Sequence, residues 1–153
     1  MKRRLRVIGL GSAQGSDRAG WLACAALEAA VRDLPLGEEA IDFVNCATPV
    51  ELPQRLEGCR AALLLDALPG EGPAFGLVRV EPAALEASGV LSSHGFGVGE
   101  GLELAAALGL LPASCSLMAI VVPPRCPDLE AGVRSLVPEL CAELQRLLQT
   151  GGT

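Results

Sequence analysis

The chain has 153 residues, a formal net charge of -6 and a sequence pI near 4.8, and half of its residues are apolar. At this length about 68–70% of the unfolded surface is buried on folding, so we expect one domain with a substantial core rather than a disordered chain. Eleven of the twelve basic residues are arginines, and only those within residues 2–6 cluster. An acidic chain without a basic stripe is not expected to bind nucleic acid.

The six cysteines are widely spaced and form no C-x-x-C motif, which argues against a zinc ribbon or a thioredoxin-type site. We expect them to be reduced and mostly buried, as in an intracellular compartment. The apolar run at residues 7–10 is too short for a signal peptide. No stretch approaches the ~18–20 apolar residues of a membrane helix, so the prediction is a cytoplasmic protein without membrane contact.

Apolar runs that end at glycine or proline predict five strands, at residues 4–10, 40–47, 60–68, 75–80 and 116–122. Helices are predicted at residues 21–34, 97–110 and 128–149, and a short one at residues 51–57 after Thr48-Pro49. Residues 81–87 are expected to form a brief turn or helix. Thr48 is a candidate cap for the second helix, Gly109 should stop the third, and Pro138 should kink or restart the last.

The predicted order is β-α-β-α-β-β-α-β-α. Helices between buried strands indicate parallel pairing with helices on both faces. We therefore predict a three-layer α/β/α sandwich with a mostly parallel sheet of about five strands, and a single domain over residues 1–153. The strand at residues 75–80 is expected at an edge of this sheet.

Ligands of open α/β sheets bind beyond the carboxyl ends of the strands, where three polar segments of this chain should meet. They contribute Asp17, Asp66 and His94, and His94 is the only histidine in the sequence. Asp66 follows a continuous apolar run, and a carboxylate is costly to bury there unless it is paired or bound to a cation. The alternatives are that Asp66 caps a turn, that Asp17 caps the following helix, and that His94 is structural.

The small residues around His94 favour an accessible imidazole, because glycines and serines on both sides leave room for a partner. Two carboxylates and one imidazole form a donor set that suits nickel, zinc, iron or manganese. Asp17, Asp66 and His94 are thus the predicted metal ligands. Arg18, next to Asp17, is expected to be solvated or to hold a carboxylate.

Other chemistries fit less well. The loop from Gly9 to Gly15 resembles a dinucleotide loop, but its spacing is G-x-G-x-x-x-G, and no acid ends the second strand at the expected point. A G-K-[ST] motif is absent, as is the G-x-S-x-G elbow of serine hydrolases. Nothing near Cys126 suggests an activated thiolate. No cofactor-binding residue and no catalytic nucleophile is assigned.

Four segments together resemble the hydrogenase maturation endopeptidases. Residues 7–21 are similar to the family's N-terminal signature, in which glycine-x-glycine-asparagine or serine precedes two acids. Residues 63–67 resemble its apolar strand ending in aspartate-alanine, and residues 92–102 its serine-x-histidine-glycine segment before a helix. Residues 118–124 match its last strand followed by proline. The chain departs at Ser16, which replaces the first acid, and at Ser12, which replaces the commoner asparagine.

This resemblance implies a three-layer α/β fold and an aspartyl-type endopeptidase. Its substrate would be the [NiFe]-hydrogenase large-subunit precursor, whose C-terminal peptide is removed after nickel insertion. The implied metal ligands are again Asp17, Asp66 and His94. The nickel would be carried by the substrate, zinc or cadmium could substitute for it, and the protein would act as a monomer. Two alternatives remain open, a non-proteolytic α/β binding module that uses the loop from Gly9 to Gly15, and a hydrogenase-assembly chaperone.

Overall fold

The computed structural model describes residues 4–34, 40–80 and 97–150. Its elements in chain order are β1 (Arg4–Leu10), the 3-10 turn η1 (Gly15–Arg18), α1 (Ala19–Val31), β2 (Ala40–Cys46), the 3-10 turn η2 (Pro49–Glu51), α2 (Leu52–Leu56), β3 (Cys59–Pro69), β4 (Gly76–Val80), α4 (Val98–Ala107), β5 (Ser114–Val122), α5 (Leu129–Arg134) and α6 (Val137–Thr150). No helix within these ranges is long and apolar enough to cross a membrane.

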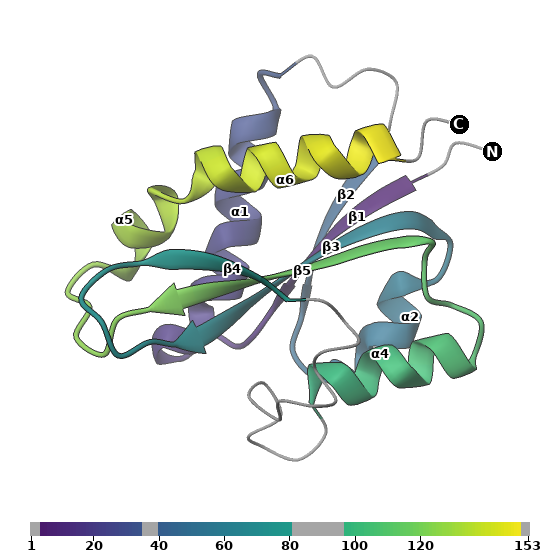
Figure 1. Ribbon diagram of the computed structural model, residues 1–153, viewed down its shortest axis with the longest axis horizontal. Coiled ribbons are helices and arrows are strands. Elements are labelled where there is room, and N and C mark those ends of the chain that lie inside the picture. Colours follow the sequence, from purple (N-terminus) through teal and green to yellow (C-terminus); the bar gives the residue numbers. More distant parts are fainter. Residues whose placement is uncertain (1–3, 35–39, 81–96, 151–153) are drawn as a thin grey trace.

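The strands form one five-stranded sheet in the order β2-β1-β3-β5-β4. β1 pairs in parallel with β2 and β3, and β3 pairs in parallel with β5. β4 is the exception, because it lies antiparallel to β5 at the edge of the sheet. The carboxyl ends of β1, β3 and β5 therefore lie at the same side of the molecule, on the left in Figure 1.

Helices cover both faces of the sheet, as the sequence predicts. α1, α5 and α6 lie over one face, and α2 and α4 lie over the other (Figure 1). The face under α1 and α6 packs around Leu27, Leu63 and Leu140, and the opposite face packs around Leu52 and Leu64. Because β3 is central, its alternating side chains Leu63, Leu64 and Leu65 enter both cores and are fully buried.

All five predicted strands are confirmed to within two residues at each end, including the edge position of β4. The first helix begins two residues earlier and ends three residues earlier than predicted. The last predicted helix is divided into α5 and α6, with Pro138 at the second position of α6, so the proline restarts the helix. The brief turn or helix expected at residues 81–87 lies outside the described residues.

One detail of the prediction is wrong, and one strand is slightly longer than predicted. Thr48 precedes η2, but its side chain makes no capping hydrogen bond. β3 ends at Pro69, one residue beyond the predicted strand end at residue 68, so Asp66 lies inside the strand. The extension has a physical cause: β5 runs beside this part of β3, pairing Leu68 with Val121 and Pro69 with Val122.

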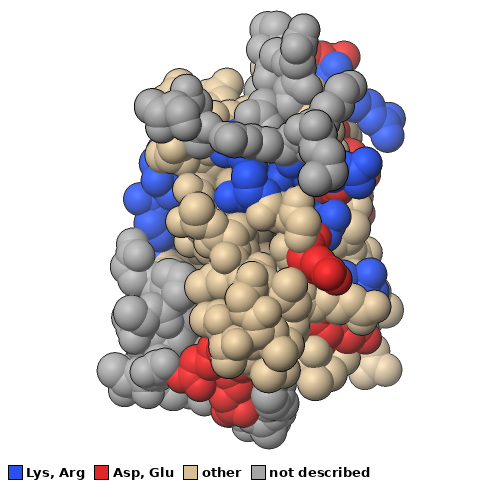
Figure 2. Space-filling view, turned by 90° about the vertical axis from the view of Figure 1, so that its right-hand side faces the viewer, with Lys and Arg blue, Asp and Glu red and all other residues tan. Residues whose placement is uncertain are grey.

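The opposite, amino edge of the sheet carries many of the basic side chains, which gather on the face shown in Figure 2. Several are already engaged. Arg4 and Arg6 reach Asp42 at 3.4 and 3.3 Å, and Arg6 also donates to the carbonyl of Arg55. Arg60 donates to the Leu147 and Leu148 carbonyls near the end of α6. These arginines therefore connect β1 to β2 and to α2, and β3 to the end of α6.

Candidate functional site

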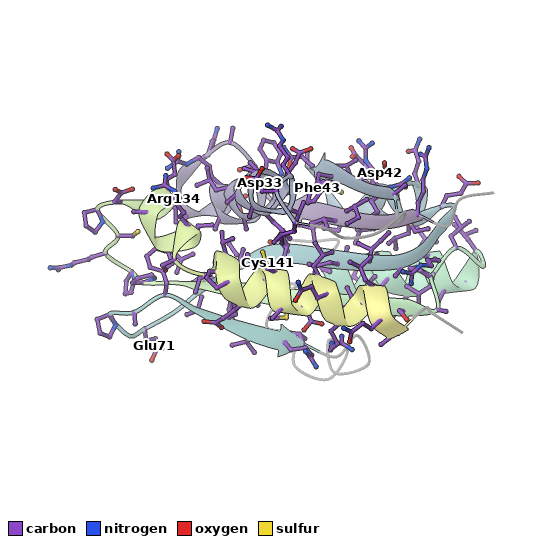
Figure 3. The ribbon with its side chains drawn as sticks, turned by 90° about the horizontal axis from the view of Figure 1, so that it is seen from above. Asp33, Asp42, Phe43, Glu71, Arg134 and Cys141 are labelled. Atoms are coloured by element: carbon purple, nitrogen blue, oxygen red, sulfur yellow. The ribbon has the colours of Figure 1, made fainter. Side chains whose placement is uncertain are left out.

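Two of the predicted ligands meet at the carboxyl edge of the sheet. Asp66 lies near the end of β3, and Asp17 lies in η1, the turn that packs against β3 from the loop after β1. The two carboxyl groups are close enough for the charge of Asp17 to raise the pKa of Asp66. In Figure 3 this side of the molecule carries the labels of Glu71, in the β3–β4 loop, and Arg134 of α5.

Glycines bring Asp17 to this position. A Cβ on Gly20, in the first turn of α1, would lie 2.1 Å from the carbonyl oxygen of Leu10 and 2.7 Å from that of Leu65. The start of α1 therefore rests directly on the backbone of β1 and β3. Gly11 has φ +141°, and a Cβ there would lie 2.1 Å from the carbonyl oxygen of Asp17. That oxygen accepts a hydrogen bond from the Ser12 N–H at 3.3 Å, which closes the loop over the strand ends.

Asp66 occupies an environment that opposes its negative charge. The residue is half-buried after five fully buried residues, and its Oδ1 accepts a hydrogen bond from the Ala67 N–H at 2.9 Å. Burial raises the pKa of Asp66 to about 7; the Ala67 hydrogen bond opposes this shift and the neighbouring Asp17 adds to it. The carboxyl group is therefore partly protonated near neutral pH. A bound cation would compensate the charge that this site disfavours.

The arrangement fits one end of a divalent-metal site. Asp17 in η1 is exposed and Asp66 in β3 is half-buried, and the two carboxyl groups are near enough to interact electrostatically. Within the described residues, no third histidine, cysteine, aspartate or glutamate joins them in a metal-binding cluster. The predicted nitrogen ligand, His94, lies outside the described residues, together with its Ser92, Ser93 and Gly95 neighbours. The donor set of two carboxylates therefore remains open to a further ligand.

The structural alternatives for these acids find little support. Asp17 does not cap α1, because the N-cap residue is Arg18 and no side chain makes a capping hydrogen bond there. Asp66 bonds only its neighbouring N–H among the described hydrogen bonds, not the turn at Gly70, whose N–H donates to the Val122 carbonyl. The side chains of Asp17 and Asp66 are thus available for another role.

The glycine loop is filled by the protein's own backbone. A Cβ on Gly9 would lie 2.7 Å from the Gly20 carbonyl oxygen, which is too close, and a Cβ on Gly11 would collide with the Asp17 carbonyl oxygen. The glycines therefore allow α1 and η1 to approach the sheet closely. This packing explains why the loop partly resembles a dinucleotide-binding loop although no phosphate needs to be bound there.

The six cysteines are all unpaired, as predicted. Only Cys24 and Cys46 are fully buried, however; the other four are half-buried. Burial raises the pKa of Cys24 to about 11 and that of Cys115 to about 12, so these thiols stay protonated at neutral pH. Neither is a candidate nucleophile.

A pocket of about 390 Å³ opens beside the acid pair, and it was not among the sequence predictions. Its lining comes from η1, the ends of β3 and β5, and the segment that leads into α5: Gly15, Ser16, Arg18, Pro69, Gly70, Val122, Pro123, Pro124, Cys126 and Leu129. The residues that could have indicated this pocket in the sequence are Arg18, next to Asp17, and the two prolines after the last strand. Their convergence depends on the strand order, which local sequence does not specify.

Neither a scan against protein-family models nor a search of the curated proteins found a match. Solved structures, in contrast, are similar over nearly the whole chain. The hydrogenase maturating endopeptidase HybD from E. coli is 20% identical, with a TM-score of 0.64, and the similarity covers 94% of this chain and 93% of that one. An endopeptidase from Escherichia coli solved in solution gives a TM-score of 0.67 at 18% identity, with the same coverage.

A [NiFe] hydrogenase maturation protease, HycI, from Thermococcus kodakarensis is also similar, with a TM-score of 0.63 at 16% identity, over 97% of this chain and 94% of that one. At these identities the likeness concerns the arrangement of the backbone. The element order, the mostly parallel sheet and the helical layers of this chain are thus those of the hydrogenase maturation endopeptidase fold.

Proposed function

We propose that this protein is an endopeptidase that removes the C-terminal peptide of a [NiFe]-hydrogenase large-subunit precursor after nickel has been inserted. The fold shared with three proteins named as maturation proteases or endopeptidases supports the proposal, and so do the four sequence segments that resemble that family. The precursor would be its partner. On this proposal the protein acts as a monomer in the cytoplasm.

The observation that carries the proposal is the half-buried Asp66 beside Asp17. Two carboxyl groups gathered at the ligand-binding edge of an α/β sheet, one with its pKa raised to about 7, form a place that favours a cation. Carboxylates and an imidazole suit nickel, and zinc or cadmium could take its place. We propose that Asp17, Asp66 and His94 bind the nickel that the precursor carries, so the ion belongs to the substrate.

The residues of this chain have separate tasks in that recognition. The Ala67 N–H donates a hydrogen bond to one carboxylate oxygen of Asp66, which leaves the other oxygen free to bind the nickel that the precursor carries. Cation binding would remove the proton from Asp66, because metal ligands must be deprotonated. Asp17 lies in η1, and this loop can lie close to the sheet because Gly11 and Gly20 have no Cβ. A bound divalent ion can polarise a nearby carbonyl group. No residue is assigned as the nucleophile.

Substitution of the three ligands tests the proposal. Asp17→Ala, Asp66→Ala and His94→Ala should each reduce processing of the nickel-loaded precursor by about 10- to 100-fold or more, as loss of a metal-site residue does. Circular dichroism should show that the variants remain folded. Asp33→Ala, at an exposed position after α1 that Figure 3 labels, is the matched control and should process normally. Full activity of the Asp66 and His94 variants would exclude this metal-recognition role.

A further inference from the structure

The pocket beside the acid pair has a chemical character of its own. Its volume of about 390 Å³ is near the lower end of the ~300–1,000 Å³ found for small-ligand sites, so it suits a side chain or a chain end rather than a folded domain. One wall is apolar and includes Val122, Pro123 and Leu129. Arg18 is the only charged residue in the lining within the described part of the chain.

Arg18 is positioned for an anion. Its Nε donates to the Gly15 carbonyl at 3.1 Å, which holds the side chain along η1. No acid of the described ranges forms an ion pair with it. The guanidinium is exposed, so its remaining N–H groups can reach a ligand.

The place of Arg18 in the fold strengthens this reading. It is the N-cap residue of the 13-residue α1, where the helix dipole is positive. A cation at this end is unfavourable by about 0.3–1 kcal/mol, whereas an anion there is favourable. A ligand carboxylate in the pocket would satisfy both Arg18 and the helix end. The same positive charge would offset repulsion from Asp17, which adjoins Arg18 in sequence.

We propose that this pocket binds a carboxylate group of the substrate peptide, with Arg18 as its partner and Pro123, Pro124 and Leu129 in contact with the adjoining apolar atoms. Arginine suits this task because its planar N–H groups match the two oxygens of a carboxylate. The inference rests on the proposed function, since it describes how the same substrate is seated beside the metal-recognition residues. The carboxylate comes either from an acidic side chain near the scissile bond or from the C-terminus of the precursor.

Steady-state kinetics with nickel-loaded precursor tests the role of Arg18. Arg18→Ala should raise KM by about 10- to 100-fold, the loss expected for one charge-assisted hydrogen bond, and should leave kcat within about twofold. Arg18→Lys should recover part of the loss. Arg32→Ala, at the exposed opposite end of α1, is the control and should match the wild type. If wild type processes the precursor and Arg18→Ala has an unchanged KM, the pocket assignment is wrong although the proposed function stands.

Altered substrates distinguish the two sources of the carboxylate. One precursor has the acidic residues near the scissile bond changed to amides, and the other has its C-terminal carboxylate replaced by an amide. The precursor that lacks the recognised group should show a raised KM with wild type, and no further increase with Arg18→Ala. Wild-type KM values that stay unchanged for both substrates would overturn the proposal.

A binding measurement keeps the test independent of cleavage. Titration of the protein with a synthetic acidic peptide matching the C-terminal segment, and with its fully amidated counterpart, should give at least ~10-fold tighter binding of the acidic form. Arg18→Ala should abolish that difference. Equal binding of the two peptides by wild type, or no binding of either, would contradict carboxylate recognition even if the protein proves not to be a peptidase.

Discussion

Asp66 is a carboxyl group in surroundings that favour its neutral form. Burial first, and the neighbouring Asp17 second, raise its pKa, and the Ala67 N–H only partly opposes them. If Asp66 served stability alone, replacing it with an uncharged residue would make the folded protein more stable at neutral and alkaline pH. On the proposed function, a cation that arrives with the substrate would compensate this charge, since a positive charge reverses the sign of the local interaction.

Asp66→Asn should therefore stabilise the protein at alkaline pH while it impairs processing. The pKa of Asp66 is raised from 3.8 to about 7, so the unfolded chain ionises first, and stability falls as pH rises from about 4 to about 7. With allowance for partial exposure, the variant should be more stable by about 1–3 kcal/mol at pH 8 and equal near pH 4. Urea unfolding at the two pH values measures this. A variant less stable than wild type at pH 8 would contradict it.

Gly20 determines how closely α1 approaches the strand ends. Gly20→Ala places a Cβ against two backbone carbonyl oxygens, so the start of α1 must move, and stability should fall by about 2 kcal/mol or more. Because Asp17 lies just before this turn, processing should fall as well. Gly72→Ala is the control, since nothing lies within 4 Å of its Cβ position, and it should be nearly neutral. Thermal unfolding and the processing assay compare the two variants; equal stability would show that the contact can relax.

The members of the site differ in how far sequence predicts them. Asp66 is evident because an acid interrupts a long apolar run. The proximity of Asp17 to Asp66 was expected only from the general rule about strand ends; the contact itself depends on backbone packing at Gly11 and Gly20. His94 remains a prediction, because it lies outside the described residues.

At the scale of elements, local pattern predicts the strands well and their arrangement incompletely. Runs such as residues 60–68 are apolar throughout because they are buried on both faces, and that signal survives without tertiary information. The order β2-β1-β3-β5-β4 depends on pairing between distant segments. That is why local sequence does not predict the pocket beyond these strand ends.

Glu143 of α6 connects three elements through a buried carboxylate that is 5% exposed. Ser116 of β5 donates to it at 2.9 Å, Arg146 donates at 2.9 Å through Nε, and Arg79 of the edge strand β4 pairs with it. Burial alone would raise its pKa, but the hydrogen bonds from Arg146, Ser116 and Arg79 together lower it. The network holds β4 and α6 to the sheet.

Glu143→Ala should destabilise the protein by about 2–4 kcal/mol at neutral pH, because the hydrogen bonds that the carboxylate accepts from the buried Ser116 hydroxyl and from the two arginines are lost. The contribution of a carboxylate with a lowered pKa is present above its ordinary value of 4.5 and is lost as pH falls through the native pKa. The difference from wild type should therefore shrink in acid. Glu139→Ala, exposed on the same helix, is the control. Denaturant unfolding of both proteins at pH 7 and pH 3 tests this. A difference in the free energy of unfolding that is the same at both pH values would argue against the charged network.

At the scale of the whole molecule, the two edges of the sheet differ in how their charges are used. At the amino edge, Arg4 and Arg6 are engaged with Asp42, and Arg60 with the end of α6. At the carboxyl edge, Asp17 and Arg18 lack such ion pairs within the described ranges and flank a pocket. This contrast supports the proposal that the substrate is recognised at the carboxyl edge.

The most direct test of the central claim compares two preparations of one hydrogenase large-subunit precursor, nickel-loaded and nickel-free, incubated separately with the purified protein. Intact-mass spectrometry follows loss of the C-terminal peptide. Cleavage of the loaded precursor only is the predicted result, because Asp17, Asp66 and His94 would read the metal that the precursor carries. Equal cleavage of both preparations, or no cleavage of a precursor with verified nickel content, would contradict it.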